Sequence, residues 1–242
     1  MKRILGIATV GVMVIGQGVF AVEDNKWDST VAAGLNMTSG NTDTTGFNAG
    51  VSAERSGEVN EIRLGLQGNY GESTVNDIDE TTTQNAKALA VYKRKYEEFF
   101  LYSDNSLFHD KIANIDSRLI LGLGGGRRLI ESDTMKLDLE LGLAYIYEDM
   151  VDMDSDDYVA AKIAARYEYD LSDSSKLWLA AEYMPNVEDL DDYLANGEAG
   201  IEAAINETLS LRVVVQDRYD STVPETLEHN DLSVVSSLVY TL

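Results

Sequence analysis

The sequence predicts an all-β protein, a closed antiparallel transmembrane β-barrel of about twelve strands. Three observations lead to this fold. The amino terminus has the layout of an exported protein, apolar residues occupy alternate positions along most of the chain, and aromatic residues gather at the ends of the expected strands. A closed barrel pairs all of its backbone groups within itself, which is the condition that a lipid bilayer imposes on β-structure.

The amino-terminal segment predicts a secretory signal peptide. A short basic start precedes an apolar run from Ile4 to Ile15, and small residues lead to an expected cleavage site after Ala21. The apolar run is shorter than the roughly 20 residues that a membrane-spanning helix needs. We therefore expect residues 1–21 to be a cleaved signal peptide and residues 22–242 to form a single outer-membrane barrel domain.

The composition excludes several classes of function. The chain has 42 acidic and 19 basic residues, a formal net charge of −23, and such a surface repels nucleic acid. It has no cysteine, which rules out disulfides, thiolate metal sites and a cysteine nucleophile. No cofactor is indicated by any motif.

The clearest strand lies at residues 135–147, where leucines and then tyrosines occupy every second position with polar or small residues between them. On a helix the same side chains would be scattered around every face, so the period of two indicates a strand. The same alternation returns in five later segments, at residues 163–169, 177–183, 193–205, 209–215 and 232–242.

The amino-terminal half repeats the alternation more weakly, at residues 31–37, 47–53, 62–70 and 119–123. Two further strands fit between Asn85 and Phe108, although the pattern does not fix which way their side chains face. This makes twelve strands. Short turns at residues 56–58, 131–134 and 206–208 alternate with longer acidic connections, as short periplasmic turns alternate with extracellular loops in outer-membrane barrels.

A soluble barrel or sandwich would show the same period of two, but its aromatic residues would not be expected to gather at the two ends of the strands. A membrane barrel carries aromatic belts at its two interfaces. With the first strand running outward, the expected outer belt is Phe47, Tyr70, Tyr145, Tyr147, Tyr183, Tyr193 and Tyr219, and the expected periplasmic belt is Trp27, Tyr92, Tyr167, Tyr169 and Tyr240.

The row opposite the lipid-facing one carries charges of both signs. Its members are Arg118, Arg128, Asp138, Glu140, Lys162, Arg166, Glu168, Glu182, Glu198, Glu202, Arg212 and Arg218. Two interpretations stay open. One is a narrow water-filled path whose charges select solutes, and the other is a salt-bridged interior that conducts little.

Glycines share this inner row, at Gly122, Gly124, Gly126, Gly142 and Gly200. They either leave room for long side chains on opposing strands or mark bends in the strands, and we expect bends.

The long connections hold much of the acid, namely Glu72, Asp77, Asp79 and Glu80 in the second, Glu148 through Asp157 in the fourth, and Glu188, Asp189, Asp191 and Asp192 in the fifth. In the fourth, Asp152, Asp154 and Asp156 alternate as in a calcium-binding loop, but the glycine and glutamate that an EF-hand requires are replaced by Asp157 and Ile163. We expect a solvated acidic loop there, with a loose divalent-cation site as the alternative.

We expect no enzymatic activity. His109 and His229 are the two histidines of the chain, and neither stands near a serine in a nucleophile motif.

The sequence also resembles a known family. The segment from Leu35 to Asp43, LNMTSGNTD, looks like the opening hairpin of the salt-induced outer-membrane proteins, also called domain of unknown function 481. The similarity continues through the glycine-rich run from Leu121 to Gly126, the turn from Ile130 to Thr134 and the strand ending at Asp149. One departure is the last residue, Leu242, where outer-membrane barrels usually end in an aromatic residue.

The resemblance implies a barrel in the outer membrane of a Gram-negative bacterium, connected with salt stress, and it supplies no catalytic residue. The expected partners are outer-membrane lipid, lipopolysaccharide and the outer-membrane assembly machinery, and we expect a monomer. The first functional hypothesis is a narrow channel for ions or small solutes in the osmotic response. The rival is a non-conducting structural or interaction barrel whose acidic loops bind cations, lipopolysaccharide or a partner.

Overall fold

The computed structural model describes residues 26–38, 43–75, 78–223 and 228–242, and the expected signal peptide lies outside them. It contains the twelve expected strands. They are β1 (Trp27–Thr38), β2 (Asp43–Ser56), β3 (Asn60–Val75), β4 (Ile78–Tyr96), β5 (Phe99–Asp110), β6 (Ile115–Glu131), β7 (Met135–Met150), β8 (Asp156–Ser172), β9 (Ser175–Pro185), β10 (Tyr193–Ala204), β11 (Leu209–Asp220) and β12 (Asn230–Thr241). Among the described residues, no helix has the length and apolar character needed to cross a membrane.

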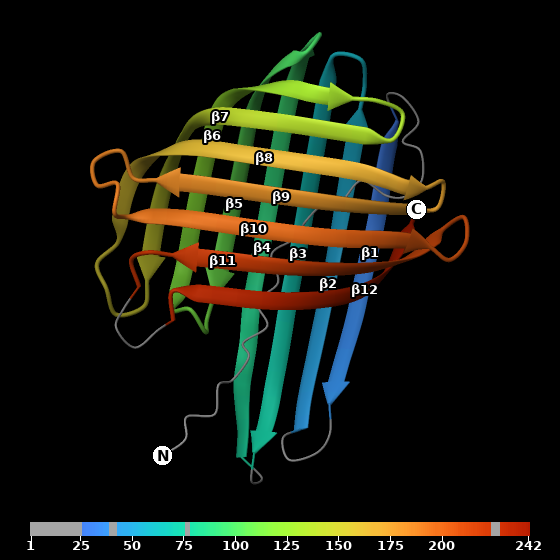
Figure 1. Cartoon of the computed structure of the whole chain (residues 1–242). Coiled ribbons are helices and arrows are strands. Elements are labelled where there is room, and N and C mark those ends of the chain that lie inside the picture. Colours follow the sequence, from blue (N-terminus) through green and yellow to red (C-terminus); the bar gives the residue numbers. More distant parts are fainter. Residues whose placement is uncertain (1–25, 39–42, 76–77, 224–227) are drawn as a thin grey trace.

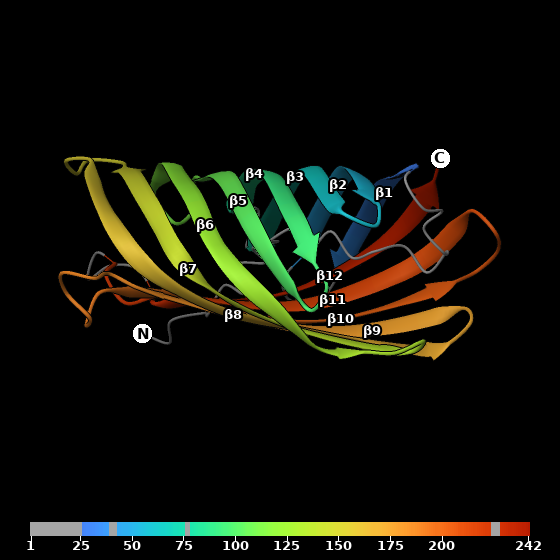
Figure 2. The same cartoon turned by 90° about the horizontal axis from the view of Figure 1, so that it is seen from above.

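Each strand pairs with its neighbours in sequence, antiparallel, and β1 pairs with β12 to close the barrel. The strands of a closed barrel are tilted by roughly 35–45° to its axis, so strands on opposite walls cross steeply. Figure 1 shows this crossing, with β8 to β12 running across the front of β1 to β5. Seen from above, the two walls face each other across a flattened interior (Figure 2).

The closing seam between β1 and β12 is the shortest pairing in the barrel. Its ladder has four residue pairs, from Thr30 opposite Thr241 to Ala33 opposite Leu238, whereas β1 and β2 are paired along the full length of β1. Beyond Ala33 the two strands diverge (Figure 1).

A side chain from β2 supports the seam where its ladder ends. The Asn48 amide donates a hydrogen bond of 3.4 Å to the carbonyl oxygen of Ser236, and the Ser237 hydroxyl donates one of 2.8 Å to the Asn48 amide oxygen. This reach passes over Gly34 of β1, where any Cβ atom would collide with the Ser236 carbonyl and with Asn48. Because residue 34 is a glycine, the Asn48 side chain can form hydrogen bonds with β12 where the backbone ladder between β1 and β12 has ended.

Side chains alternate between the two faces of the wall as the sequence predicts. On β7, Leu141 and Leu143 are 65% and 57% exposed on the outer face, whereas Ala144 and Ile146 on the inner face are fully buried. The outer face is a band of aliphatic side chains, which fits lipid rather than water. This confirms the fold class that the sequence predicts.

The facing of β4 and β5, which the sequence leaves open, is settled by the structure. On β5, Leu101 and Leu107 are exposed on the outer face, while Phe100, Tyr102 and Phe108 are buried on the inner face. Apolar and aromatic residues thus occupy both rows of this strand. A period-two pattern cannot be read where both rows are apolar.

The two ends of the barrel differ in their connections. One end, here called the short-turn end, joins strands through residues 57–59, 97–98, 132–134, 173–174 and 205–208. The opposite end, here called the long-loop end, includes the connections at residues 111–114, 151–155, 186–192 and 221–229. The short turns agree with the predicted ones to within one or two residues.

The second acidic connection is not the loop that the sequence predicts. β3 and β4 continue as a paired hairpin, with Glu72 opposite Thr81, Ser73 opposite Glu80 and Thr74 opposite Asp79. Threonine favours extended backbone, and threonine and serine hydroxyls hydrogen-bond across strands. The Thr74 hydroxyl donates to the Asp79 carboxylate at 2.7 Å. Of the four predicted loop residues, Asp77 lies outside the described part of the chain.

The aromatic residues lie where the belt argument places them. At the long-loop end, Tyr183, Tyr193 and Tyr219 form a continuous row on the outer face, with ring centroids 5.2 and 5.4 Å apart. Trp27 and Tyr240 are exposed on the outer face at the short-turn end. Aromatic rings at both ends of an aliphatic band are typical of a membrane-spanning barrel.

The inner-row glycines make room for side chains, so the expectation of strand bends is wrong. A Cβ atom at Gly122 would collide with Asp104, one at Gly126 with the Phe100 ring, and one at Gly200 with the indole of Trp178. Gly124 and Gly142 both lie against Tyr102. Large inward side chains on β5 and β9 thus rest on glycines of the neighbouring strands, which a flattened barrel requires.

This packing predicts the effect of adding one methyl group on β10. The three atoms nearest to a Cβ at Gly200 all belong to Trp178, so we expect Gly200→Ala to lower the free energy of unfolding by about 1–3 kcal/mol. Gly197→Ala on the same strand is the matched control, because its nearest neighbour is an ordinary 3.9 Å contact with Asp217. Urea unfolding of the barrel refolded in lipid vesicles measures both. Equal losses in the two variants would contradict the packing argument.

Candidate functional site: the mixed-charge interior

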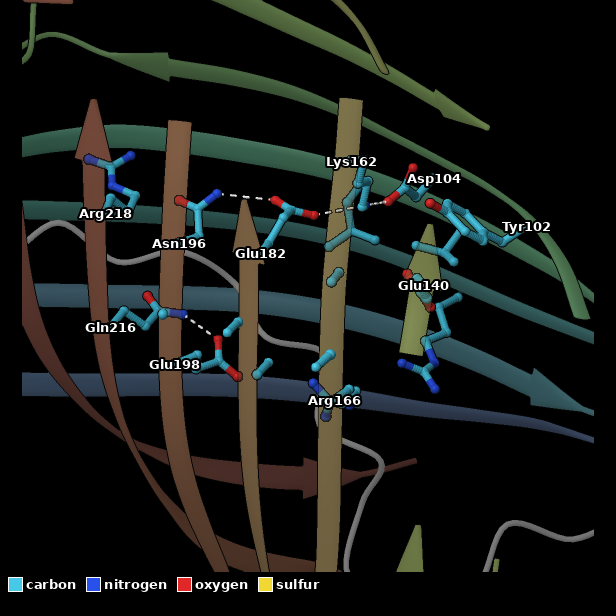
Figure 3. A pocket seen from close by; sticks show the side chains of 18 of the residues that line it. Tyr102, Asp104, Glu140, Lys162, Arg166, Glu182, Asn196, Glu198, Gln216 and Arg218 are labelled. Atoms are coloured by element: carbon cyan, nitrogen blue, oxygen red, sulfur yellow. Dashed lines mark hydrogen bonds and ion pairs between the residues drawn. The ribbon is translucent and has the colours of Figure 1, made fainter. Parts of the chain in front are cut away.

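A central cavity of about 260 Å³ lies inside the barrel between β4, β5 and the wall from β7 to β11 (Figure 3). Because successive side chains of a strand point to opposite faces, every second side chain of these strands points toward the interior. The cavity's inward-facing charged residues are five basic and four acidic. They are Arg63, Lys93, Lys162, Arg166 and Arg218, and Asp104, Glu140, Glu182 and Glu198. The cavity is therefore almost neutral, although the chain as a whole is strongly acidic.

One side of this cavity is a chain of polar contacts across four strands. Lys162 of β8 forms ion pairs with Asp104 of β5 and, at 2.7 Å, with Glu182 of β9. The Asn196 amide of β10 donates to Glu182 at 3.1 Å. Figure 3 shows these residues in one line along the cavity. The Lys162 side chain is only 6% exposed, so the two carboxylates supply the charge compensation that water would otherwise give.

The other side of the cavity holds a carboxylate with different partners. Glu198 accepts hydrogen bonds from the indole N–H of Trp178 and, at 2.8 Å, from the Gln216 amide. Both donors are neutral. Arg166, which faces the same cavity (Figure 3), pairs through its Nε with Glu168 at 2.7 Å.

A second cavity of about 270 Å³ lies toward the long-loop end. It shares Asn196 and Arg218 with the central cavity, so the two meet at these side chains. Arg218 is held there by Asp110 and Asp231, each at 3.2 Å. The junction therefore carries a guanidinium that two carboxylates hold in place.

The same cavity contains a second arginine with two carboxylate partners. Arg118 contacts Glu148 at 2.6 Å and Asp220 at 2.5 Å. Arg118 and Arg218 thus connect β6, β7, β11, β12 and the end of β5 across the interior, at the level where the ladder between β1 and β12 has already ended.

Toward the short-turn end the interior is filled by ion pairs, here called the basal ion-pair layer. Its contacts include Lys93 with Glu140 at 2.8 Å, Arg128 with Asp138 at 2.8 Å, Arg63 with Glu61 at 2.6 Å and Arg212 with Glu202 at 2.6 Å. Glu61 and Glu202 are 3% and 1% exposed. Buried charges at this density require partners, because an unpaired one would carry its full desolvation cost.

The twelve charges predicted for the inner row all point inward, but they do not form one site. Glu140, Lys162, Arg166, Glu182 and Glu198 line the central cavity, Arg118 lines the second, and Arg218 lines both. The others belong to buried ion pairs that line neither cavity, namely Arg128, Asp138, Glu168, Glu202 and Arg212.

The three charged groups that the β3 to β5 wall contributes to the central cavity were not predicted from the sequence. Arg63, Lys93 and Asp104 all lie there, on strands of weak or uncertain phase. One signal was available: once Tyr92 is assigned to the periplasmic aromatic belt on the lipid-facing side, alternation turns Lys93 inward.

The remaining candidates form no site. Asp152, Asp154 and Asp156 are exposed at the connection between β7 and β8, and no group of three metal-binding side chains occurs among the described residues. His109 and His229 each donate from Nδ1 to a backbone carbonyl oxygen at 2.8 Å, of Asp116 and Asp220 respectively.

Comparisons with known proteins agree with this architecture. A model of the family described as "Protein of unknown function, DUF481" matches residues 31–242. The uncharacterized protein YdiY of Escherichia coli K12 is 24% identical over 232 residues, which cover 93% of this chain and 89% of that protein.

Two solved structures share the fold. The COG4313 outer membrane channel from Pseudomonas putida F1 matches with a TM-score of 0.57 and 10% identity over 95% of this chain and 100% of its own. A NanC porin matches with a TM-score of 0.51 and 6% identity over 88% and 97%. Both neighbours are outer-membrane channels by name rather than enzymes, and at these identities the likeness concerns the fold alone.

The ion pairs of Lys162 predict a large effect on stability. Lys162→Met would leave the partly buried carboxylates of Asp104 and Glu182, 22% and 28% exposed, without their lysine, so we expect the free energy of unfolding to fall by about 1.5–3 kcal/mol. Arg127→Met is the control, since the Arg127 to Glu98 pair is more than half exposed and should contribute about 0–1 kcal/mol. Urea titration of the refolded barrels compares them. A loss at Lys162 no larger than the control's would show that the central pair is hydrated.

Proposed function

Since this chain belongs to the DUF481 family, whose function is unknown, we propose its role from the site itself: a barrel that passes ions or small polar solutes through a narrow, mixed-charge interior. The observation that carries the proposal is the pair of cavities in series, which meet at Arg218 and Asn196. Both are lined by charged side chains of both signs, and such a lining favours water and small charged solutes over apolar ones.

We place the barrel in the outer membrane of a Gram-negative bacterium, after removal of residues 1–21. The short-turn end would face the periplasm and the acidic long-loop end the outside. An outward mouth with many carboxylates concentrates cations and is sensitive to ionic strength, which suits a role in the osmotic or salt response. The aliphatic band and the two aromatic belts support this placement.

A second candidate function is supported by the basal ion-pair layer. If that layer stays closed, the barrel conducts nothing and serves as a structural or interaction protein. Its acidic connections, such as the one at residues 186–192, would then bind cations or lipopolysaccharide. Neutralising Glu188, Asp189 and Asp191 together should weaken the envelope's resistance to detergent in that case, without a change in conductance.

The deciding measurement is single-channel current through the refolded mature protein in a planar bilayer under a salt gradient. We expect small, discrete conductance steps. Arg218→Gln should raise the conductance and shift the reversal potential toward cations, because it removes the positive charge at the junction of the two cavities and frees Asp110 and Asp231.

Arg127→Gln on the outer face is the matched control and should leave both quantities unchanged. Silence from a barrel whose folding is verified by circular dichroism and by its mobility on a gel without heating would reject conduction and favour the second candidate.

A further inference from the structure

Two opposite charges face the central cavity without pairing with each other. Among the described residues, the acceptor oxygens of Glu198 are hydrogen-bonded to Trp178 and Gln216, and no basic side chain lies within ion-pair distance of them. Arg166 uses its Nε for Glu168, while its Nη2 atom is buried and has no hydrogen-bond partner. The cavity thus presents one carboxylate without a cation and one guanidinium edge without an acceptor.

These two groups are the least compensated of the charged residues that line the central cavity. Arg166 contacts one carboxylate, and Glu198 has no ion-pair partner among the described residues. The other basic residues of the cavity each contact two carboxylates, namely Arg63, Lys93, Lys162 and Arg218. An unsatisfied buried donor costs about 1–3 kcal/mol, more when it is charged. Arg166 and Glu198 are therefore the two complementary charges of this cavity that the protein compensates least.

We infer that the central cavity binds a small zwitterionic solute, with its carboxylate on Arg166 and its ammonium group on Glu198. This inference rests on the proposed function and names the class of solute for it. A simple anion would satisfy Arg166 alone, and a simple cation would satisfy Glu198 alone. A solute with both charges satisfies both groups at once and adds no net charge to a cavity that is already nearly neutral.

The size of the cavity agrees with a small solute. Its volume of about 260 Å³ lies below the roughly 300–1,000 Å³ of pockets that hold drug-sized ligands. A short amino acid fits within this limit, whereas a sugar chain or a peptide does not.

The charge of the protein favours the same class of solute. The chain carries a net charge of −23, and the connection at residues 186–192 on the long-loop end contains Glu188, Asp189, Asp191 and Asp192. Such a field repels free anions over several ångströms. A zwitterion has no net charge, so it reaches Arg166 without the electrostatic barrier that an anion of the same size meets.

Trp178 provides a direct reporter of binding. The chain has two tryptophans, so Trp27→Phe leaves Trp178 alone, and the indole of Trp178 donates to Glu198. Titration of this single-tryptophan barrel with β-alanine should give a saturable shift of emission. Propionate and ethylammonium, which carry only one of the two charges each, should give none over the same concentrations.

Two charge-removing variants separate the roles. Arg166→Gln and Glu198→Gln should each weaken β-alanine binding by about tenfold or more, since each removes a charged hydrogen-bonding partner. Arg127→Gln on the outer face should leave the affinity unchanged. If Arg166→Gln does not fold, Arg166→Lys keeps the charge, and it should bind β-alanine more weakly because it lacks the guanidinium edge.

The outcomes are distinguishable from those of the conductance experiment, because binding is measured without ion flow. Equal responses to propionate and β-alanine, with no effect of Glu198→Gln, would overturn the inference and leave a plain anion site. No saturable response to any of the three probes from a folded barrel would also overturn it, even if the barrel conducts.

Discussion

The constraint on which this structure depends is that every backbone N–H and C=O group in the wall must find a partner inside the barrel. Lipid offers no hydrogen bonds, and an unpaired group there costs several kcal/mol. Twelve antiparallel strands meet most of the demand by pairing with their neighbours and closing on β1 and β12, where the ladder has four pairs. Closure then fixes the tilt of the strands, the crossing of the two walls and the alternation of side chains between lipid and interior.

That alternation determines which side chains line the interior. Half of the side chains of each strand must point inward, and in this sequence many of those are charged. In a flattened barrel these charges lie close together and away from bulk water. The result is an interior held by ion pairs, with large side chains such as Trp178 and Tyr102 resting on glycines of adjacent strands. The cavities are the volume that remains between these pairs.

The fold is well predicted from the sequence because it depends on two patterns. Apolar residues alternate along each strand with a period of two, and aromatic residues lie at the strand ends. Leu137 to Tyr147 alternate without interruption, and the aromatic residues mark the strand ends. The sequence predicts the site less well for a physical reason. Inward charges can be identified from alternation, but their pairing depends on which strands face each other across the interior, as Lys162 and Asp104 do from β8 and β5.

β5 shows the same limit at the level of one strand. Phe100, Tyr102 and Phe108 are apolar residues that face inward, because glycines of β6 and β7 leave room for the first two and Arg218 lies over the ring of the third. No pattern within β5 itself predicts that these aromatic residues face inward. The glycine run of β6 would have been the signal, had it been interpreted as space for a neighbour rather than as a bend.

The short seam between β1 and β12 also bears on how the molecule forms. All other pairings join strands that follow each other in sequence, whereas this one joins the two ends of the described chain, so its closure carries the largest loss of chain entropy. Four residue pairs, a backbone hydrogen bond of 2.9 Å from Leu242 to the Ser29 carbonyl oxygen, and the Asn48 bridge offset that loss. The sheet from β2 to β11 is therefore complete before the ring is, and the same joint is the first place at which a folded barrel would locally unzip.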